Sequence, residues 1–112
     1  MAGQVIVFIT ADSKKTSAAI ITSLLTKRLA ACVNELPGVI SRYWWKGAVE
    51  TSREILLMVK TKSSMVKKII AETKKIHPYE VPEIISVVIR DGNTDYLKWI
   101  DKETKARTGE KQ

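Results

Sequence analysis

Residues 39–61 read VISRYWWKGAVETSREILLMVKT, and this stretch decides the fold. Its two ends, residues 39–45 and 53–61, are rich in β-branched, aromatic and aliphatic side chains, which are typical of strands. Lys46 and Gly47 lie between them and are typical of a tight turn. The stretch therefore predicts a β-hairpin.

Both faces of this hairpin are largely apolar. Side chains alternate between the two faces of a strand, so the second strand divides into two sets. These are Ile55, Leu57 and Val59 on one face, and Glu54, Leu56, Met58 and Lys60 on the other. A strand of this kind needs a cover on both of its sides.

A strand and a helix are expected before the hairpin. The run QVIVFIT, residues 4–10, is typical of a buried strand and is interpreted as one, rather than as a signal peptide. Asp12 and Ser13 are suited to cap a helix, which NELPG (34–38) is expected to end. The buried stripe expected for this helix comprises Ala18, Ile21, Leu25, Leu29 and Cys32, widened by Ile20 and Leu24.

A second helix, a strand and a last helix are expected after the hairpin. Ser63 and Ser64 are suited to cap the second helix, which Pro78 ends. Its expected stripe comprises Met65, Ile69, Thr73 and Ile76, with Val66 and Ile70 beside it. VPEIISVVIR (81–90) predicts the fourth strand, and TDYLKWIDKETKA (94–106) predicts a short helix packed through Tyr96, Leu97 and Ile100.

The expected order of elements is β-α-β-β-α-β plus a terminal helix, which is an α+β, ferredoxin-like arrangement. In this arrangement the helices cover one face of the sheet. The other face would expose an aliphatic and aromatic patch larger than a monomer ordinarily shows to water. A second copy of the chain is the simplest cover, so the sequence predicts a homo-oligomer built through the sheets.

Composition sets the class of protein. The chain has 112 residues, of which 45% are hydrophobic, and this suits one domain over residues 1–104 with a basic, polar and flexible tail over 105–112. Its apolar runs, about five residues at most, are too short to span a membrane. The lone Cys32 excludes an intrachain disulfide framework, which indicates a reducing, cytoplasmic setting. The net charge of +7 is interpreted as a solvated basic surface, because acids interrupt the basic residues.

Five segments resemble one known family when they are taken together and in order. They are KRLAACVNELPG (27–38), SRYWWKG (41–47), REILLMVKT (53–61), HPYEVPEI (77–84) and DYLKWI (95–100). This series resembles the CutA family, named for divalent-cation tolerance, from Val5 to about Thr104. The resemblance implies a ferredoxin-like fold similar to the PII signalling proteins, a homotrimer, and a cytosolic protein linked to copper or another divalent cation. It also implies no established enzymatic reaction.

His77, the only histidine, is compatible with two roles. Imidazole is a common ligand of copper and zinc, so His77 is a candidate metal or anion contact. A histidine followed by Pro78 also suits a helix C-terminus, where it would be structural. The resemblance favours a subunit cleft at this segment, and both readings stay open.

Cys32 is the second candidate metal ligand, because copper favours thiolates. As a continuation of the first helix's apolar stripe, it is equally typical of a buried, unreactive cysteine. Glu80 and Glu83 are the nearest acids to His77 in sequence, and the chain contains no CxxC, HxH or HExxH spacing. Any copper site is therefore expected to be weak or shared between subunits.

A cleft between subunits is expected beside the hairpin. Its candidate residues are Tyr43, Trp45, Glu54 and Lys60, with Tyr79 and Glu80 from a neighbouring chain. Such a cleft suits a small anion, as in a PII-like sensor, or a cation. The alternative is that Glu54 and Lys60 form ion pairs between subunits.

Two further functions are not expected. Trp44, Trp45 and Trp99 could stack on bases. However, the signature of RNA-binding sheets is absent, and a trimer would bury the sheet face that such proteins use. The sequence also shows no nucleophile elbow, glycine-rich phosphate loop or acid/base pair, so the chain is not expected to be an enzyme.

Overall fold

Four antiparallel strands form one sheet in the computed structural model, which describes residues 3–105. The strands are β1 (Gln4–Ala11), β2 (Cys32–Trp45), β3 (Ala48–Lys62) and β4 (Ile84–Val88), and their order across the sheet is β2-β3-β1-β4. The chain thus has the expected ferredoxin-like order of elements. Of the tail expected over 105–112, residues 106–112 lie outside the described part of the chain, and the last helix ends at Glu103, earlier than expected.

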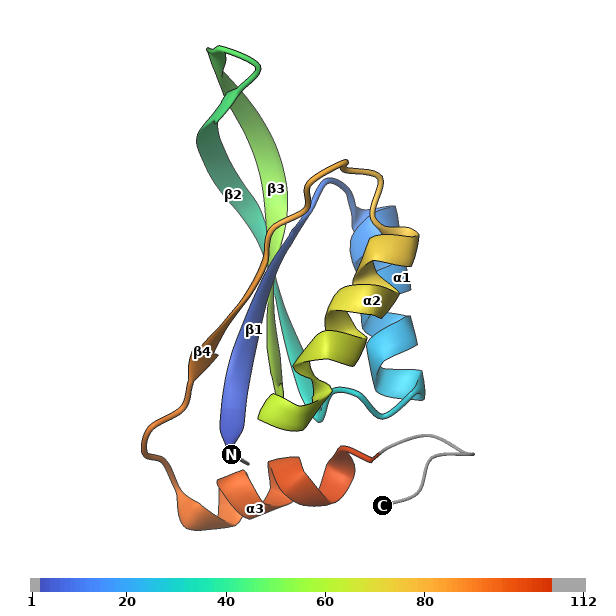
Figure 1. The fold of residues 1–112 in the computed structure, drawn as a ribbon, viewed down its shortest axis with the longest axis vertical. Helices are drawn as coiled ribbons and strands as arrows, with labels where there is room; N and C mark the ends of the chain where they lie inside the picture. Colours follow the sequence, from blue (N-terminus) through green and yellow to red (C-terminus); the bar gives the residue numbers. More distant parts are fainter. Residues whose placement is uncertain (1–2, 106–112) are drawn as a thin grey trace.

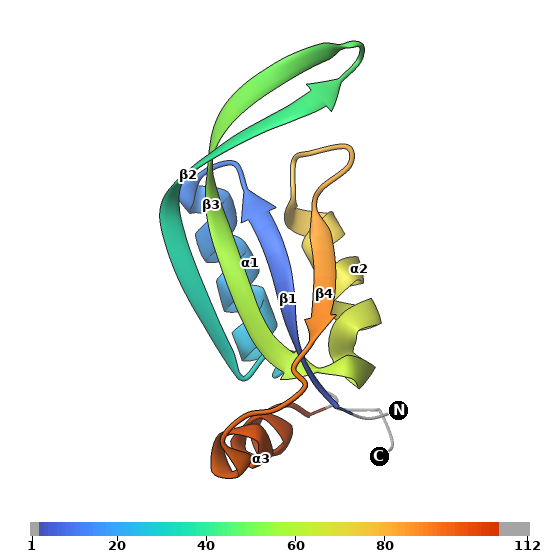
Figure 2. The ribbon, with the colours of Figure 1, turned by 90° about the vertical axis from the view of Figure 1, so that its left-hand side faces the viewer.

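Two helices cover one face of this sheet, α1 (Lys14–Thr26) and α2 (Val66–Ile76), and a 3-10 turn, η1 (Ser63–Met65), leads into α2. The helix α3 (Thr94–Glu103) lies across one end of the sheet (Figure 1). The view from the side shows α1 and α2 behind the strands, and nothing in front of them (Figure 2). Within residues 3–105 the other face of the sheet is therefore uncovered, as the sequence predicts.

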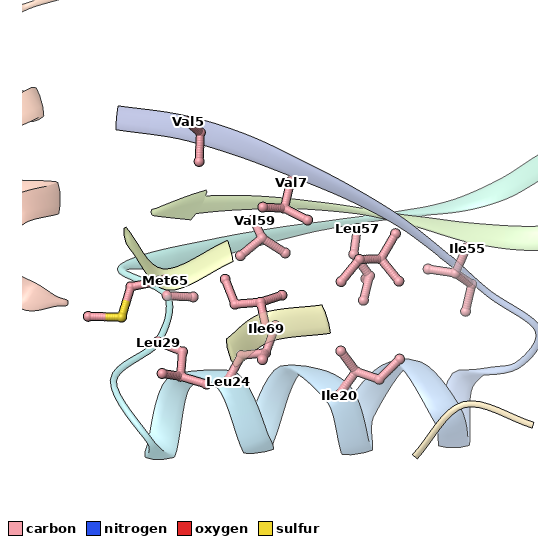
Figure 3. Close-up of a cluster of buried hydrophobic side chains, with 12 residues drawn as sticks. Val5, Val7, Ile20, Leu24, Leu29, Ile55, Leu57, Val59, Met65 and Ile69 are labelled. Atoms are coloured by element: carbon pink, nitrogen blue, oxygen red, sulfur yellow. The ribbon is translucent and has the colours of Figure 1, made fainter. Parts of the chain in front are cut away.

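The core lies between the sheet and the pair α1 and α2. Alternate residues of the two central strands point into it: Val5, Val7 and Ile9 from β1, and Ile55, Leu57 and Val59 from β3. Ile20 and Leu24 of α1 and Ile69 of α2 meet them from the other side (Figure 3). Removing a side chain of this size from water contributes about 1.5–3 kcal/mol, so this layer supplies most of the driving force for folding.

The first helix is shorter than the sequence predicts, and its stripe is shifted. Arg28 has a φ of +57°, a left-handed conformation that ends the helix, and the Leu29 N–H donates to the carbonyl of Leu24. Ser17, Ile20 and Leu24 are the buried residues of α1, whereas Leu25 is 41% exposed. The expected stripe and the observed stripe both contain apolar residues at helical spacing. Only the side of the helix that packs against the sheet distinguishes them.

NELPG belongs to β2 and does not form a loop. Pairing shifts between Leu36 and Val39, where an irregularity in the ladder accommodates Pro37, and Gly38 adopts a φ of +80°. Cys32 begins β2 and so is not part of the first helix. The expected hairpin is confirmed and is longer at both ends. Lys46 and Gly47 both have positive φ, as a two-residue type I′ turn requires.

The elements after the hairpin agree with the expected order, with differences at their ends. His77 directly follows α2 and is already extended, with a ψ of 132°, and Pro78 comes next. Ser63 and Ser64 lie in η1, and the residue that precedes α2 is Met65, which makes no side-chain cap. The α2 helix therefore does not begin at the expected serine caps. In α3 Ile100 is fully buried, whereas Tyr96 stays 40% exposed in the single chain.

The shifted stripe of α1 can be tested with two neighbouring leucines. We expect Leu24→Ala to lower the free energy of unfolding by about 2–5 kcal/mol, since it removes a fully buried side chain. Leu25→Ala should cost less than about 1 kcal/mol, since this leucine is half exposed. Denaturant unfolding at one protein concentration measures both. Equal losses in the two variants would contradict the placement of the helix.

Candidate functional site

A cleft of about 810 Å³ lies between the hairpin and the segment that follows Pro78. Five of the six residues that the sequence analysis assigned to a cleft line it, namely Tyr43, Trp45, Glu54, Tyr79 and Glu80. Its formation depends on the hairpin extending past the sheet and on the chain between α2 and β4 turning back toward that hairpin (Figure 1). A cleft of this size is in the range of small-molecule sites.

Glu54 and Tyr79 form the central contact of this cleft. The Tyr79 hydroxyl donates to Glu54 Oε2 at 2.8 Å, and the Glu54 residue is only 6% exposed. Burial first, and then the Glu54 carboxylate, raise the pKa of Tyr79 far above its ordinary value, so the phenol stays protonated. The structure pairs these residues within one chain, whereas Tyr79 was expected to come from a neighbouring chain.

Two further contacts order the aromatic side of the cleft. The Tyr43 hydroxyl and Ser52 Oγ are 2.7 Å apart across the hairpin. The Lys46 ammonium lies 5.7 Å from the centroid of the Trp45 ring, within the range of a cation–π contact. The hairpin thus presents aromatic rings whose positions are set by its own side chains.

Lys60 does not lie in the cleft. It is six residues from Glu54 along β3, which is about 20 Å of extended strand. Its ammonium donates to Asn34 Oδ1, and its backbone pairs with Cys32 on β2. The expected combination of Glu54 and Lys60 therefore does not form within one chain. Strand spacing places them on the same face of β3 but too far apart for one small ligand.

His77 is buried, and both of its ring nitrogens are engaged. Nε2 lies 2.7 Å from the backbone carbonyl of Thr10, and Nδ1 lies 3.2 Å from the backbone nitrogen of Tyr79. A carbonyl can only accept and a backbone N–H can only donate, so Nε2 carries the proton and Nδ1 accepts. This arrangement leaves no free lone pair for a metal, and it ties the end of β1 to the start of the segment that lines the cleft.

Cys32 lies near the opposite end of the sheet from His77. It pairs with Lys60 of β3, whereas the Thr10 that holds His77 pairs with Leu56, about 13 Å away along the same strand. Burial first, and then the Cys32 thiol, raise the pKa of Tyr96. Among residues 3–105 no three His, Cys, Asp or Glu side chains gather as a metal site. Cys32 and His77 thus do not fit a shared copper site within one chain.

The uncovered face of the sheet is apolar across all four strands. Phe8 pairs with Met58 on one side and Ile85 on the other, and Leu36 pairs with Leu56. Leu36 is 40% exposed and Ile85 is 54% exposed. This surface, defined by Ile6, Phe8, Leu36, Leu56, Met58, Ile85 and Val87, is called the open face below.

Some residues line the cleft without having been expected there from the sequence. Arg42, Trp44 and Thr10 also line the cleft. The alternation of a flat strand places Arg42 and Trp44 opposite Tyr43 and Trp45. Both sets reach the cleft because the two-stranded ribbon twists strongly beyond the sheet (Figure 2). No residue pattern indicates the amount of this twist, although the length of the paired run was a signal that a ribbon would protrude.

A family model described as "CutA1 divalent ion tolerance protein" matches residues 5–103. The chain belongs to the CutA1 family. It is 42% identical over 99 residues to the "Divalent-cation tolerance protein CutA" of Thermus thermophilus, covering 88% of this chain and 96% of that protein. It is 40% identical over 99 residues to "Protein CutA" of Mus musculus, covering 88% of this chain but 56% of that protein. The chain thus spans little more than half the length of this vertebrate relative, and 57% of a "chloroplastic" CutA 1 from Oryza sativa.

Solved CutA1 structures have the same fold. The structure from Thermus thermophilus superposes with a TM-score of 0.89 at 41% identity, covering 91% of this chain and 99% of the other. CutA1 from Oryza sativa superposes with a TM-score of 0.88 at 38% identity, covering 91% and 94%. The ferredoxin-like arrangement expected from the sequence is therefore confirmed.

The two hydrogen bonds of the His77 ring allow its structural and metal-binding roles to be tested against each other. We expect His77→Ala to lower the free energy of unfolding by about 2–4 kcal/mol, since it leaves the Thr10 carbonyl and the Tyr79 N–H without partners. Denaturant unfolding measures this loss, and copper titration of the same variant should show the affinity of the unmodified chain. A variant of unchanged stability and weakened copper binding would establish His77 as a ligand instead.

Proposed function

We propose that this chain is a non-enzymatic CutA protein that acts in divalent-cation tolerance as a homotrimer. The observation that supports the trimer is the open face, an apolar surface that crosses every strand and that residues 3–105 leave uncovered. Apolar patches of this extent mark interaction sites. Three copies packed through this face would bury it, and the protruding hairpin of each copy could reach a neighbour.

The family supports the metal part of the proposal in general terms. The Thermus thermophilus relative is named a divalent-cation tolerance protein. The proposal does not extend to copper held jointly by Cys32 and His77, because one chain keeps them apart and engages both imidazole nitrogens. Cys32 remains the candidate for a contact at the open face, where copies of the chain would meet.

The proposal also includes a ligand cleft formed by Tyr43, Trp45, Glu54, Tyr79 and Glu80. The small-anion alternative, a PII-like sensor, finds no support in this geometry. Among the described residues that line the cleft, three carboxylates face one basic side chain, Arg42. An anion would enter against the resulting field. The comparisons with known proteins give no specific support to that alternative either.

The setting is proposed to be the cytoplasm, on the ground that a chain with a single cysteine forms no intrachain disulfide. No helix among the described residues has the length and apolar character needed to cross a membrane. One relative is named chloroplastic, and a related protein of known structure from Archaeoglobus fulgidus is named periplasmic. Fractionation of the source cells decides this part of the proposal.

The trimer is tested by its mass and by a charge placed on the open face. Light scattering should give three times the chain mass of 12.6 kDa. Met58→Glu should reduce the mass to that of one chain, because a carboxylate cannot be buried among apolar neighbours without a partner. Thr22→Glu, an exposed position on α1, is the control and should leave the trimer intact. A native chain that stays monomeric at micromolar concentration would refute the proposal.

A further inference from the structure

The cleft differs in charge from the rest of the molecule. The chain has a net charge of +7, yet Glu54, Glu80 and Glu83 line the cleft against the single guanidinium of Arg42 among the described lining residues. The charge of Asp12 acts on the Tyr79 hydroxyl and adds to the negative side of the balance, while the Lys46 ammonium beside Trp45 adds to the positive side, so acids still outnumber bases. A concave surface on which one sign of charge predominates concentrates ligands of the opposite sign. The field of the cleft therefore selects a cation.

The walls of the cleft are aromatic. Tyr43, Trp44, Trp45 and Tyr79 all line it. The π faces of indole and phenol rings attract ammonium groups, with indole the strongest. The chain already shows this preference at the edge of the cleft, where the Lys46 ammonium lies 5.7 Å from the Trp45 ring centroid. These walls suit a cation with an apolar body, which can contact the rings.

Glu54 provides the charged end of such a site. The Glu54 residue is almost completely buried, and among the described residues its Oε2 accepts a hydrogen bond from the Tyr79 hydroxyl. A carboxylate has about four acceptor positions, so it can accept an ammonium N–H as well. Tyr79 stays protonated next to it, because burial and Glu54 raise the pKa of the phenol, so the hydroxyl remains a donor to Glu54.

A bare metal ion fits this cleft less well. No cysteine or histidine is among its described lining residues, and no three acids in residues 3–105 converge as a metal site. Hard divalent cations require about six oxygen ligands at close range, and indole rings supply none. The volume of about 810 Å³ is also large for an ion and ordinary for an organic molecule.

We propose that this cleft binds a small organic cation of the alkylammonium class, with the ammonium at Glu54 and the alkyl part against Trp45 and Tyr43. This inference names the ligand of the cleft included in the proposed function and rests on that cleft. It does not depend on the trimer or on metal tolerance. The three tryptophans make it testable, since Trp44 and Trp45 lie in the cleft and Trp99 lies on α3 at the other end of the sheet (Figure 1).

The experiment is an NMR titration of the indole N–H signals with butylammonium chloride at constant ionic strength. The signal of Trp45 should shift saturably, while that of Trp99 should not move. The matched neutral compound, 1-butanol, should shift Trp45 at least tenfold less at equal concentration. Magnesium chloride and ATP serve as inorganic-cation and anion probes, and neither should compete with butylammonium.

Two variants locate the site. Glu54→Gln keeps the shape of the side chain and removes its charge, so it should weaken butylammonium binding at least tenfold. Glu103→Gln removes a carboxylate from α3, at the other end of the sheet, and should leave the affinity unchanged. If Glu54→Gln does not fold, Trp45→Leu replaces it and should also weaken binding.

Several results would overturn the inference. One is the absence of a saturable Trp45 shift, and another is an equal response to butanol. Unchanged butylammonium affinity in Glu54→Gln would also refute it. A Glu54→Gln variant that binds as before but loses the native mass in light scattering would show that Glu54 holds a subunit contact instead. A chain of monomeric mass that still binds butylammonium would refute the proposed trimer and leave this inference standing.

Discussion

The whole structure depends on a sheet that has two apolar faces and helices for only one of them. Val7 and Leu57 point toward α1 and α2, while the neighbouring Phe8 and Met58 point the other way. The first pair is buried within the chain, and the second lies on the open face. Folding of one chain therefore leaves apolar surface in contact with water, and association of copies is the physical remedy.

A second constraint places the cleft at the far end of that sheet. Pro78 cannot continue α2, so the chain leaves the helix at His77. The imidazole fixes this exit by bonding the Thr10 carbonyl and the Tyr79 N–H. Tyr79 is then held where its hydroxyl meets Glu54 on β3. His77 thus joins the end of α2 to the end of β1, and through Tyr79 to the hairpin. The cleft forms beside this junction.

The sequence was sufficient for the order of the elements, because the hairpin alternation and Pro78 are local signals. It did not separate Leu24 from Leu25, since both continue an apolar stripe and only packing against the sheet distinguishes them. Five of the six residues expected at a cleft line one within the single chain, and Lys60 does not, because a shared strand face says nothing about distance along the strand. Arg42 was missed because the twist of the ribbon depends on tertiary structure.

The central claim, that copies of the chain cover the open face, is tested most directly by hydroxyl-radical footprinting of two matched leucines. Leu36 on the open face and Leu25 on α1 are 40% and 41% exposed in a single chain. Our account predicts that Leu36 is protected in the native protein while Leu25 is labelled. Equal labelling of Leu36 and Leu25 would contradict it.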